Sequence, residues 1–261
     1  MGTPIRGTVD GLALYHYAAD GPSIVVIHGT MDRAGGFRRT ARQLEGFDIT
    51  VFDRRGYAGS REAGLAPTMA DQVCDLASVI EHVGRGAVTV LGHSLGALIA
   101  MHASLARPDL IASIGAWEPP LPWLAWYGES AGTRAREVAA TEDPGAAAES
   151  FMRLMIGDRL WDRLPTATRD ERRAEGPALL ADLTLCRMPD AELDLADVVV
   201  PVLVGFGSES PERFRRSAAT LMESLPDPMG LEVADASHGV HLSHPAELAA
   251  FARAAAARVP I

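Results

Sequence analysis

The sequence predicts an α/β protein built on a doubly wound, mostly parallel sheet with helices on both faces. Continuous apolar runs at 23–27 and 87–91 are typical of strands that are covered on both sides. Segments with a helical pattern alternate with such runs, and this alternation favours parallel βαβ units. A chain of 261 residues that is 48% hydrophobic can also bury one large core.

The first half of the chain supplies most of these elements. Residues 4–17 are expected to form a hairpin, because two short alternating runs flank the turn sequence Val9-Asp10-Gly11. Thr68 is the expected N-cap of a helix that has Asp71 and Gln72 in its first turn. The elements expected after the hairpin are a strand at 23–27, a helix at 34–44, a strand at 48–52, a helix at 69–83, a strand at 87–91, a helix beginning near 97 and a strand at 111–116.

The alternation stops between about residue 119 and residue 198, where the chain is helical in pattern and acidic. Pro119-Pro120-Leu121-Pro122 opens this segment, and such a run disfavours regular structure. We therefore predict a helical cap at 121–190, inserted into a core made of residues 1–120 and 191–261; an ordinary run of packing helices is the alternative. The remaining elements are expected to be a strand at 199–204, a helix at 212–225, a strand at 231–233 and a closing helix at 245–258.

Composition excludes several classes of function. A net charge of −10 and a pI near 5.3 disfavour nucleic acid or an anionic membrane as the partner. No apolar run is long enough to span a membrane and no signal-peptide pattern opens the chain, so a cytoplasmic protein is expected. The chain contains no lysine, which excludes Schiff-base chemistry and a Ser-Lys dyad. A homodimer is compatible with this sequence.

The most informative motif is Gly92-His93-Ser94-Leu95-Gly96, which lies between a predicted strand and a predicted helix. A Gly-x-Ser-x-Gly pattern at a strand-to-helix turn is a nucleophile elbow. The sharp turn presents the hydroxyl of Ser94 at the amino end of a helix, where backbone N–H groups favour a developing oxyanion. Ser94 is therefore the predicted nucleophile.

An activated serine needs a base, and His238 is the best candidate. It lies just after the last predicted strand, in a loop that can return it to Ser94. His241 and His244 follow at three-residue spacing, but no carboxylate or cysteine completes a recognised ligand pattern. We therefore expect no metal site, and His241 and His244 are expected to pack and to cap the helix that opens at Pro245.

The oxyanion requires two N–H donors. One is expected to be the amide of Leu95, directly after the nucleophile. The other is expected from the loop His28-Gly29-Thr30-Met31, where Thr30 is the best candidate because Gly29 lets the chain bend close to the serine.

The order of these motifs resembles the α/β-hydrolase superfamily, in the form of a serine hydrolase with a helical cap. The resemblance rests on His28-Gly29, on Asp53-Arg54-Arg55-Gly56-Tyr57-Ala58-Gly59-Ser60, on the elbow and on His238, and it covers nearly the whole chain outside the cap. It implies a mostly parallel eight-stranded sheet, a cap after the sixth strand and ester-type acyl transfer. Within the second motif, the resemblance implies a structural role for Asp53 and Arg55, which hold neighbouring loops in contact.

The third member of the triad departs from the usual pattern of the family. The resemblance places the acid after the seventh strand, and this position falls on Ser210, which cannot orient an imidazole as a carboxylate does. Glu209 is adjacent to it. Glu118 follows the sixth predicted strand, where relatives resembling haloalkane dehalogenases carry their acid. We favour Glu118 and keep Glu209 as the alternative.

The sequence thus predicts a hydrolase that forms an acyl-enzyme on Ser94 and needs no cofactor. The aromatic and methionine content of the cap favours a small, largely apolar carboxylic ester or lactone. A non-hydrolytic relative of secondary metabolism (a lyase, cyclase, transferase or perhydrolase) remains an alternative, and a ligand receptor is a further one. The residues expected to line the substrate pocket are His28, Trp117, Trp123, Trp126 and Met155.

Overall fold

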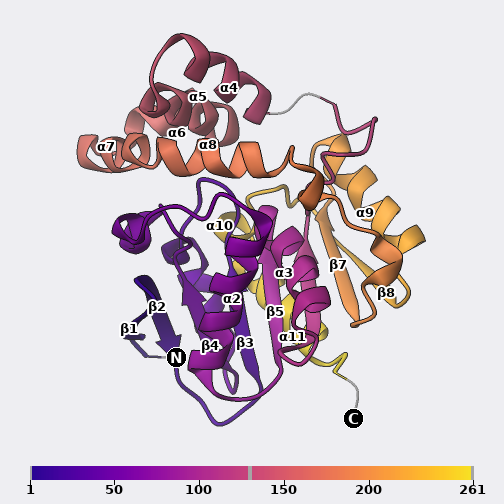
Figure 1. Ribbon diagram of the computed structural model, residues 1–261. Coiled ribbons are helices and arrows are strands. Elements are labelled where there is room, and N and C mark those ends of the chain that lie inside the picture. Colours follow the sequence, from indigo (N-terminus) through magenta and orange to yellow (C-terminus); the bar gives the residue numbers. More distant parts are fainter. Residues whose placement is uncertain (1, 129–130, 260–261) are drawn as a thin grey trace.

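The protein is organised around one eight-stranded sheet (Figure 1). This computed structural model describes residues 2–128 and 131–259. The strand order is β1-β2-β4-β3-β5-β6-β7-β8; β2 pairs antiparallel with β1 and β4, and all other pairs are parallel. The predicted mostly parallel eight-stranded sheet is confirmed. The strands are β1 (Ile5–Val9), β2 (Leu12–Tyr17), β3 (Ser23–Ile27), β4 (Asp48–Phe52), β5 (Val88–His93), β6 (Ile111–Trp117), β7 (Val202–Gly207) and β8 (Pro228–Val233).

Helices cover both faces of the sheet. Leu76 and Leu98 belong to the apolar core on one face, and Phe37 and Phe251 belong to the core on the other. In Figure 1, α2 and α3 lie in front of the sheet and α11 lies behind it. The core helices are α1 (Arg38–Gln43), α2 (Met69–Val83), α3 (Leu95–Ala106), α9 (Glu212–Ser224), α10 (Val240–Ser243) and α11 (Pro245–Ala256).

Local sequence explains where several elements begin. Thr68 caps α2 as predicted: its hydroxyl accepts a hydrogen bond from the N–H of Asp71, whose carboxylate accepts one from the N–H of Thr68. The helix predicted at 34–44 is instead a 3-10 turn (Ala34–Phe37) followed by α1, because two adjacent glycines weaken an α-helix there. β7 starts at Val202, three residues after the start of the predicted strand, because Pro201 has no N–H to donate to the neighbouring strand.

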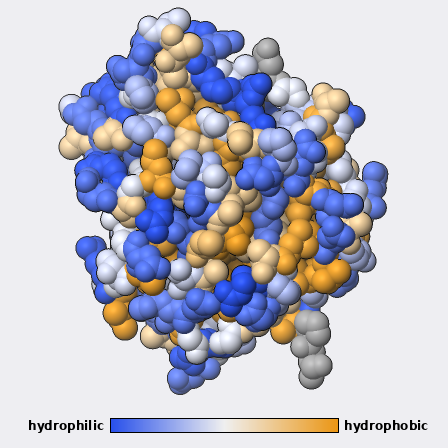
Figure 2. All heavy atoms as spheres, in the orientation of Figure 1, coloured by the Kyte–Doolittle hydropathy of each residue, from blue (hydrophilic) through white to orange (hydrophobic). Residues whose placement is uncertain are grey.

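A layer of five helices lies between β6 and β7 in the chain and above the sheet in Figure 1. These cap helices are α4 (Ala131–Thr141), α5 (Pro144–Ile156), α6 (Asp158–Arg163), α7 (Thr166–Ala174) and α8 (Gly176–Leu185). Figure 2 shows hydrophilic residues over much of the cap on the face in view. None of the described helices combines the length and the apolar character needed to cross a membrane.

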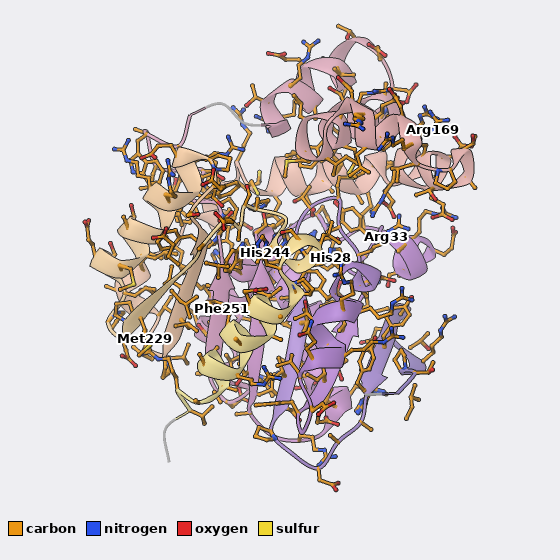
Figure 3. All side chains as sticks on the ribbon, turned by 180° about the vertical axis from the view of Figure 1, so that it is seen from behind. His28, Arg33, Arg169, Met229, His244 and Phe251 are labelled. Carbon is orange, nitrogen blue, oxygen red and sulfur yellow. The ribbon has the colours of Figure 1, made fainter. Side chains whose placement is uncertain are left out.

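Buried polar contacts fasten the cap to the core. Arg54, after β4, pairs with Asp182 of α8 at 2.5 Å, and both side chains are almost completely buried. The hydroxyl of Tyr57 donates to the same carboxylate at 2.7 Å. Arg33, labelled at the boundary between core and cap in Figure 3, pairs with Glu175 at 2.8 Å. These contacts hold the cap over the end of the sheet where Ser94 lies.

Candidate active site

Ser94 occupies a strained turn between β5 and α3. Its φ of 54° and ψ of −124° lie in a region that residues with a side chain rarely adopt. A methyl group at Gly92 would overlap the backbone of Ala97, and one at Gly96 would overlap the carbonyl of Ile27. Both glycines of the pentapeptide are therefore required for the elbow to form.

Glu118 is the carboxylate that contacts His238. Its Oε2 lies 2.7 Å from Nδ1 of His238, and its side chain is completely buried at the end of β6. Its Oε1 accepts hydrogen bonds from the N–H of Gly207, at 2.9 Å, and from the hydroxyl of Ser210. Ser210 thus occupies the position where the family resemblance places the acid, and its hydroxyl donates to the carboxylate that reaches His238 from the neighbouring strand.

The alternative acid points elsewhere. The N–H of Glu209 donates to the carbonyl of Ala236 at 2.9 Å, and the residue is exposed. Across the described residues, no hydrogen bond joins the Glu209 carboxylate to His238. The geometry therefore favours Glu118 over Glu209.

His238 is held from two sides in the loop after β8. The ring of Phe214 stacks on its imidazole, with centroids 4.1 Å apart and planes at 8°. Nε2 of His93, in the elbow itself, hydrogen-bonds to the carbonyl of His238 at 2.8 Å. No hydrogen bond joins Ser94 to His238 among the described residues. In unliganded enzymes such bonds often tighten only when substrate is bound.

The N–H groups of Thr30 and Leu95 face the same site. Neither has a hydrogen-bond acceptor in the described part of the chain, and both residues line a cavity with Ser94. Leu95 is the first residue of α3, so its amide is one of the unpaired donors that every helix leaves at its amino end. Two free donors beside the serine suit an oxyanion.

Two cavities, of about 440 Å³ and about 400 Å³, meet at Ser94 and His238. Of the predicted pocket residues, Trp123 lines the first cavity and Met155 lines both. The predicted pocket positions of Trp117 and Trp126 are wrong. Trp117 is fully buried in the sheet against Phe251, at 5.6 Å between ring centroids, because its strand has both faces covered. Trp126 lies outside both cavity linings.

The predicted pocket position of His28 is also wrong, because its ring is fully buried inside the core (Figure 3). Its Nε2 accepts a hydrogen bond from the N–H of Arg54 at 2.9 Å, and its Nδ1 donates to the carbonyl of Gly29 at 2.7 Å. Burial, with the positive charge of Arg54, lowers the pKa of His28 to about 3. His28 is therefore a neutral structural link between two loops of the site.

Comparison with known proteins identifies the family. Residues 24–251 match the profile described as Alpha/beta hydrolase family. The chain belongs to this family. This α/β hydrolase is 31% identical, over 86% of its length and 90% of the other protein's, to pimeloyl-[acyl-carrier protein] methyl ester esterase of Chromobacterium violaceum.

Two further matches agree with this assignment. Lipase LipV of Mycobacterium tuberculosis is 34% identical over 110 residues, and this match spans 41% of each protein. The structure of a bromoperoxidase from Bacillus anthracis superimposes with a TM-score of 0.74 at 19% identity, covering 93% of this chain and 96% of the other, which shows a common fold. Together with its esterase and lipase relatives, the family membership makes this chain an α/β-hydrolase enzyme.

Sequence reasoning missed a cluster beside the site of this α/β hydrolase. Asp32, His93 and His241 each offer one ligand atom, and these atoms lie within 4.8 Å of one another. Oδ2 of Asp32 is 3.1 Å from Nε2 of His241. Burial alone would raise the pKa of Asp32, but the attraction and hydrogen bond of His241, together with the attraction of His93 and His28, outweigh it and hold that pKa well below its ordinary value. Two histidines and an aspartate are ligands that a transition metal accepts. This set shares only His241 with the group His238, His241 and His244 that is spaced at three residues in the sequence.

Proposed function

We propose that this α/β hydrolase is a serine esterase that cleaves small carboxylic esters or lactones through an acyl-enzyme on Ser94. The observation that carries the proposal is the contact of 2.7 Å between buried Glu118 and His238, at a cavity that also exposes Ser94. A strained serine, an oriented imidazole and free N–H donors form the arrangement that acyl transfer requires.

The proposed reaction has two halves. Nε2 of His238 takes the proton of Ser94 as its oxygen attacks the ester carbonyl carbon, and the amides of Thr30 and Leu95 stabilise the oxyanion. His238 then gives this proton to the departing alcohol oxygen. A water molecule gives a proton to His238 and attacks the acyl-enzyme; His238 then returns that proton to the oxygen of Ser94 as the acid departs, which restores the free enzyme. Throughout, Glu118 holds the proton on Nδ1 and stabilises the imidazolium.

The two cavities supply places for the two halves of an ester. Both reach Ser94, so the acyl chain and the alcohol can extend in different directions from the reacting carbon. Phe151, Met155 and Phe214 line both cavities and present apolar surface next to the serine. This lining supports a substrate that is apolar near its ester bond.

The named relatives support the same class of reaction. One is a methyl ester esterase and another is a lipase. They support an ester as the substrate class of this chain.

Labelling with a fluorophosphonate probe tests the proposal. We expect the wild-type protein to be labelled and the Ser94→Ala variant to be unlabelled. Ser243→Ala is a matched control, because Ser243 lines the second cavity but takes no part in the proposed reaction. An unlabelled wild type, or a Ser94→Ala variant that keeps its label, contradicts the proposal.

A further inference from the structure

Three arginines line the first cavity together with Ser94. Arg136 comes from α4, Arg187 follows the end of α8, and Arg213 lies in the first turn of α9. Two thus belong to the cap and one to the core. Segments that are far apart in the sequence bring three guanidinium groups to one space.

The described part of the chain gives these guanidinium groups no acidic partner. Within residues 2–128 and 131–259, none of the three forms an ion pair, whereas Arg153 of the same cap pairs with three carboxylates. The chain has 34 acidic residues against 24 basic ones, so partners are plentiful elsewhere. Glu192 is the one acidic residue in the described wall of this cavity; it is exposed and pairs with none of the three.

Arg136 lies close to a like charge, and Arg213 lies close to the reaction centre. Burial and the neighbouring charge of Arg187 lower the pKa of Arg136, as expected for like charges that lie close together. Nε of Arg213 is buried and has no hydrogen-bond partner among the described residues. The guanidinium of Arg213 lies 4.9 Å from the ring centroid of Phe214, which in turn stacks on His238.

We propose that this arginine cluster binds an ionised carboxylate carried by the substrate, at a distance from the ester bond. The inference rests on the proposed esterase function and refines its substrate class: an ester with an apolar segment next to the reacting carbonyl and an anionic end. A carboxylate placed among Arg136, Arg187 and Arg213 would relieve the repulsion between Arg136 and Arg187 and form charge-assisted hydrogen bonds. It takes no part in the bond changes.

Matched esters test this inference and also locate the carboxylate. p-Nitrophenyl hydrogen suberate carries it on the acyl half and is compared with p-nitrophenyl octanoate. p-Acetoxybenzoate carries it on the alcohol half and is compared with p-tolyl acetate. In one of the two pairs we expect kcat/KM to favour the charged ester, by roughly tenfold to a hundredfold after correction for intrinsic reactivity.

Arginine variants attribute the preference to the cluster. Arg136→Gln and Arg213→Gln are expected to remove most of it, while Arg136→Lys retains part of it because the charge remains. Arg163→Gln is the control, since Arg163 is an exposed cap arginine outside both cavity linings, and it should keep the wild-type preference. Molar sodium chloride should weaken the preference by screening.

Binding measured without turnover separates this inference from the esterase proposal. Calorimetric titration of the Ser94→Ala protein should show tighter binding of the charged ester of the preferred pair, and Arg136→Gln in that background should abolish the difference. If the wild type cleaves neutral and charged esters equally and both bind Ser94→Ala equally, the carboxylate site is refuted and the esterase proposal stands. If no ester is cleaved, the esterase proposal fails and the titration alone decides on the carboxylate site.

Discussion

Replacing Glu118 by glutamine changes one atom of the site and leaves its shape nearly intact. Oε1 of Glu118 accepts from Gly207 and Ser210, and a glutamine oxygen could keep both bonds. The remaining oxygen, which accepts from Nδ1 of His238, would become an amide nitrogen that can only donate. His238 would then have to carry its proton on Nε2 and could no longer take the proton of Ser94.

The size of the effect follows from this change of tautomer and from the burial of the carboxylate. In enzymes with a Ser-His-Asp triad, exchanging the acid for its amide lowers kcat by about 10⁴-fold. Glu118 is completely buried, so water cannot replace its charge beside the imidazolium. We expect Glu118→Gln to lower kcat by about 10³-fold to 10⁴-fold, which corresponds to about 4–5.5 kcal/mol of barrier.

The assay is steady-state release of p-nitrophenol from p-nitrophenyl acetate, with thermal unfolding measured on the same samples. Glu209→Gln is the matched control and should keep wild-type kcat, because its side chain is exposed and, among the described residues, forms no hydrogen bond with His238. A Glu118→Gln variant that is folded and retains wild-type kcat would refute the assignment of the acid. A large loss in Glu209→Gln would refute it as well.

Three further predictions concern stability. Gly96→Ala should lower the free energy of unfolding by about 3 kcal/mol, because the added methyl group overlaps the end of β3. In the control Gly7→Ala the added methyl group meets no atom within 4 Å, so this variant should be nearly neutral. Equal midpoints of urea unfolding for the two variants would contradict this prediction. Arg54→Ala should lower the free energy of unfolding in urea by about 3–5 kcal/mol, because it leaves the buried carboxylate of Asp182 without its opposite charge. The double change Arg54→Met with Asp182→Leu should recover part of this loss, since it removes the buried charge but leaves the hydroxyl of Tyr57 without its acceptor; a double variant as unstable as Arg54→Ala would argue against the reasoning. His28 has a pKa of about 3 in the folded protein and the ordinary value of 6.5 in the unfolded chain, so the unfolded chain binds more protons between these two pH values. The contribution of His28 to the free energy of unfolding is therefore complete above pH 6.5. It falls as the pH drops towards 3, by at most about 1.4 kcal/mol per pH unit. In unfolding measured across this range, His28→Gln should show a shallower loss, and an unchanged slope would exclude His28 as its source.

The parts of the site that a local motif encodes could be predicted from the sequence. A serine between two glycines at a strand-to-helix turn has few structural alternatives, so Ser94 and its strained backbone follow from five residues. Glu118 was predicted because a charged residue directly after an apolar strand is hard to explain as packing. The sequence alone does not exclude Glu209 as the acid, because the choice between Glu118 and Glu209 requires their distances to His238.

The remaining parts depend on contacts between distant segments. Phe214 stacks on His238 from a helix start that carries no motif, and Arg54 meets Asp182 across 128 residues. Trp117 was misplaced because a strand with both faces covered shows no alternation, so the sequence does not reveal which face a side chain occupies. The arginine cluster escapes sequence reasoning because its three members come from separate segments, and only the folded cap brings them to one cavity.

Trapping the acyl-enzyme tests the central claim most directly. The wild-type protein is mixed with p-nitrophenyl acetate, quenched in acid within the first turnover, digested and mapped by mass spectrometry. We predict an acetyl group on Ser94, in the peptide that contains the elbow, and its absence from the Ser94→Ala protein. Turnover with Ser94 unmodified, or an acetyl group that persists elsewhere in the active Ser94→Ala variant, would contradict an acyl-enzyme on Ser94.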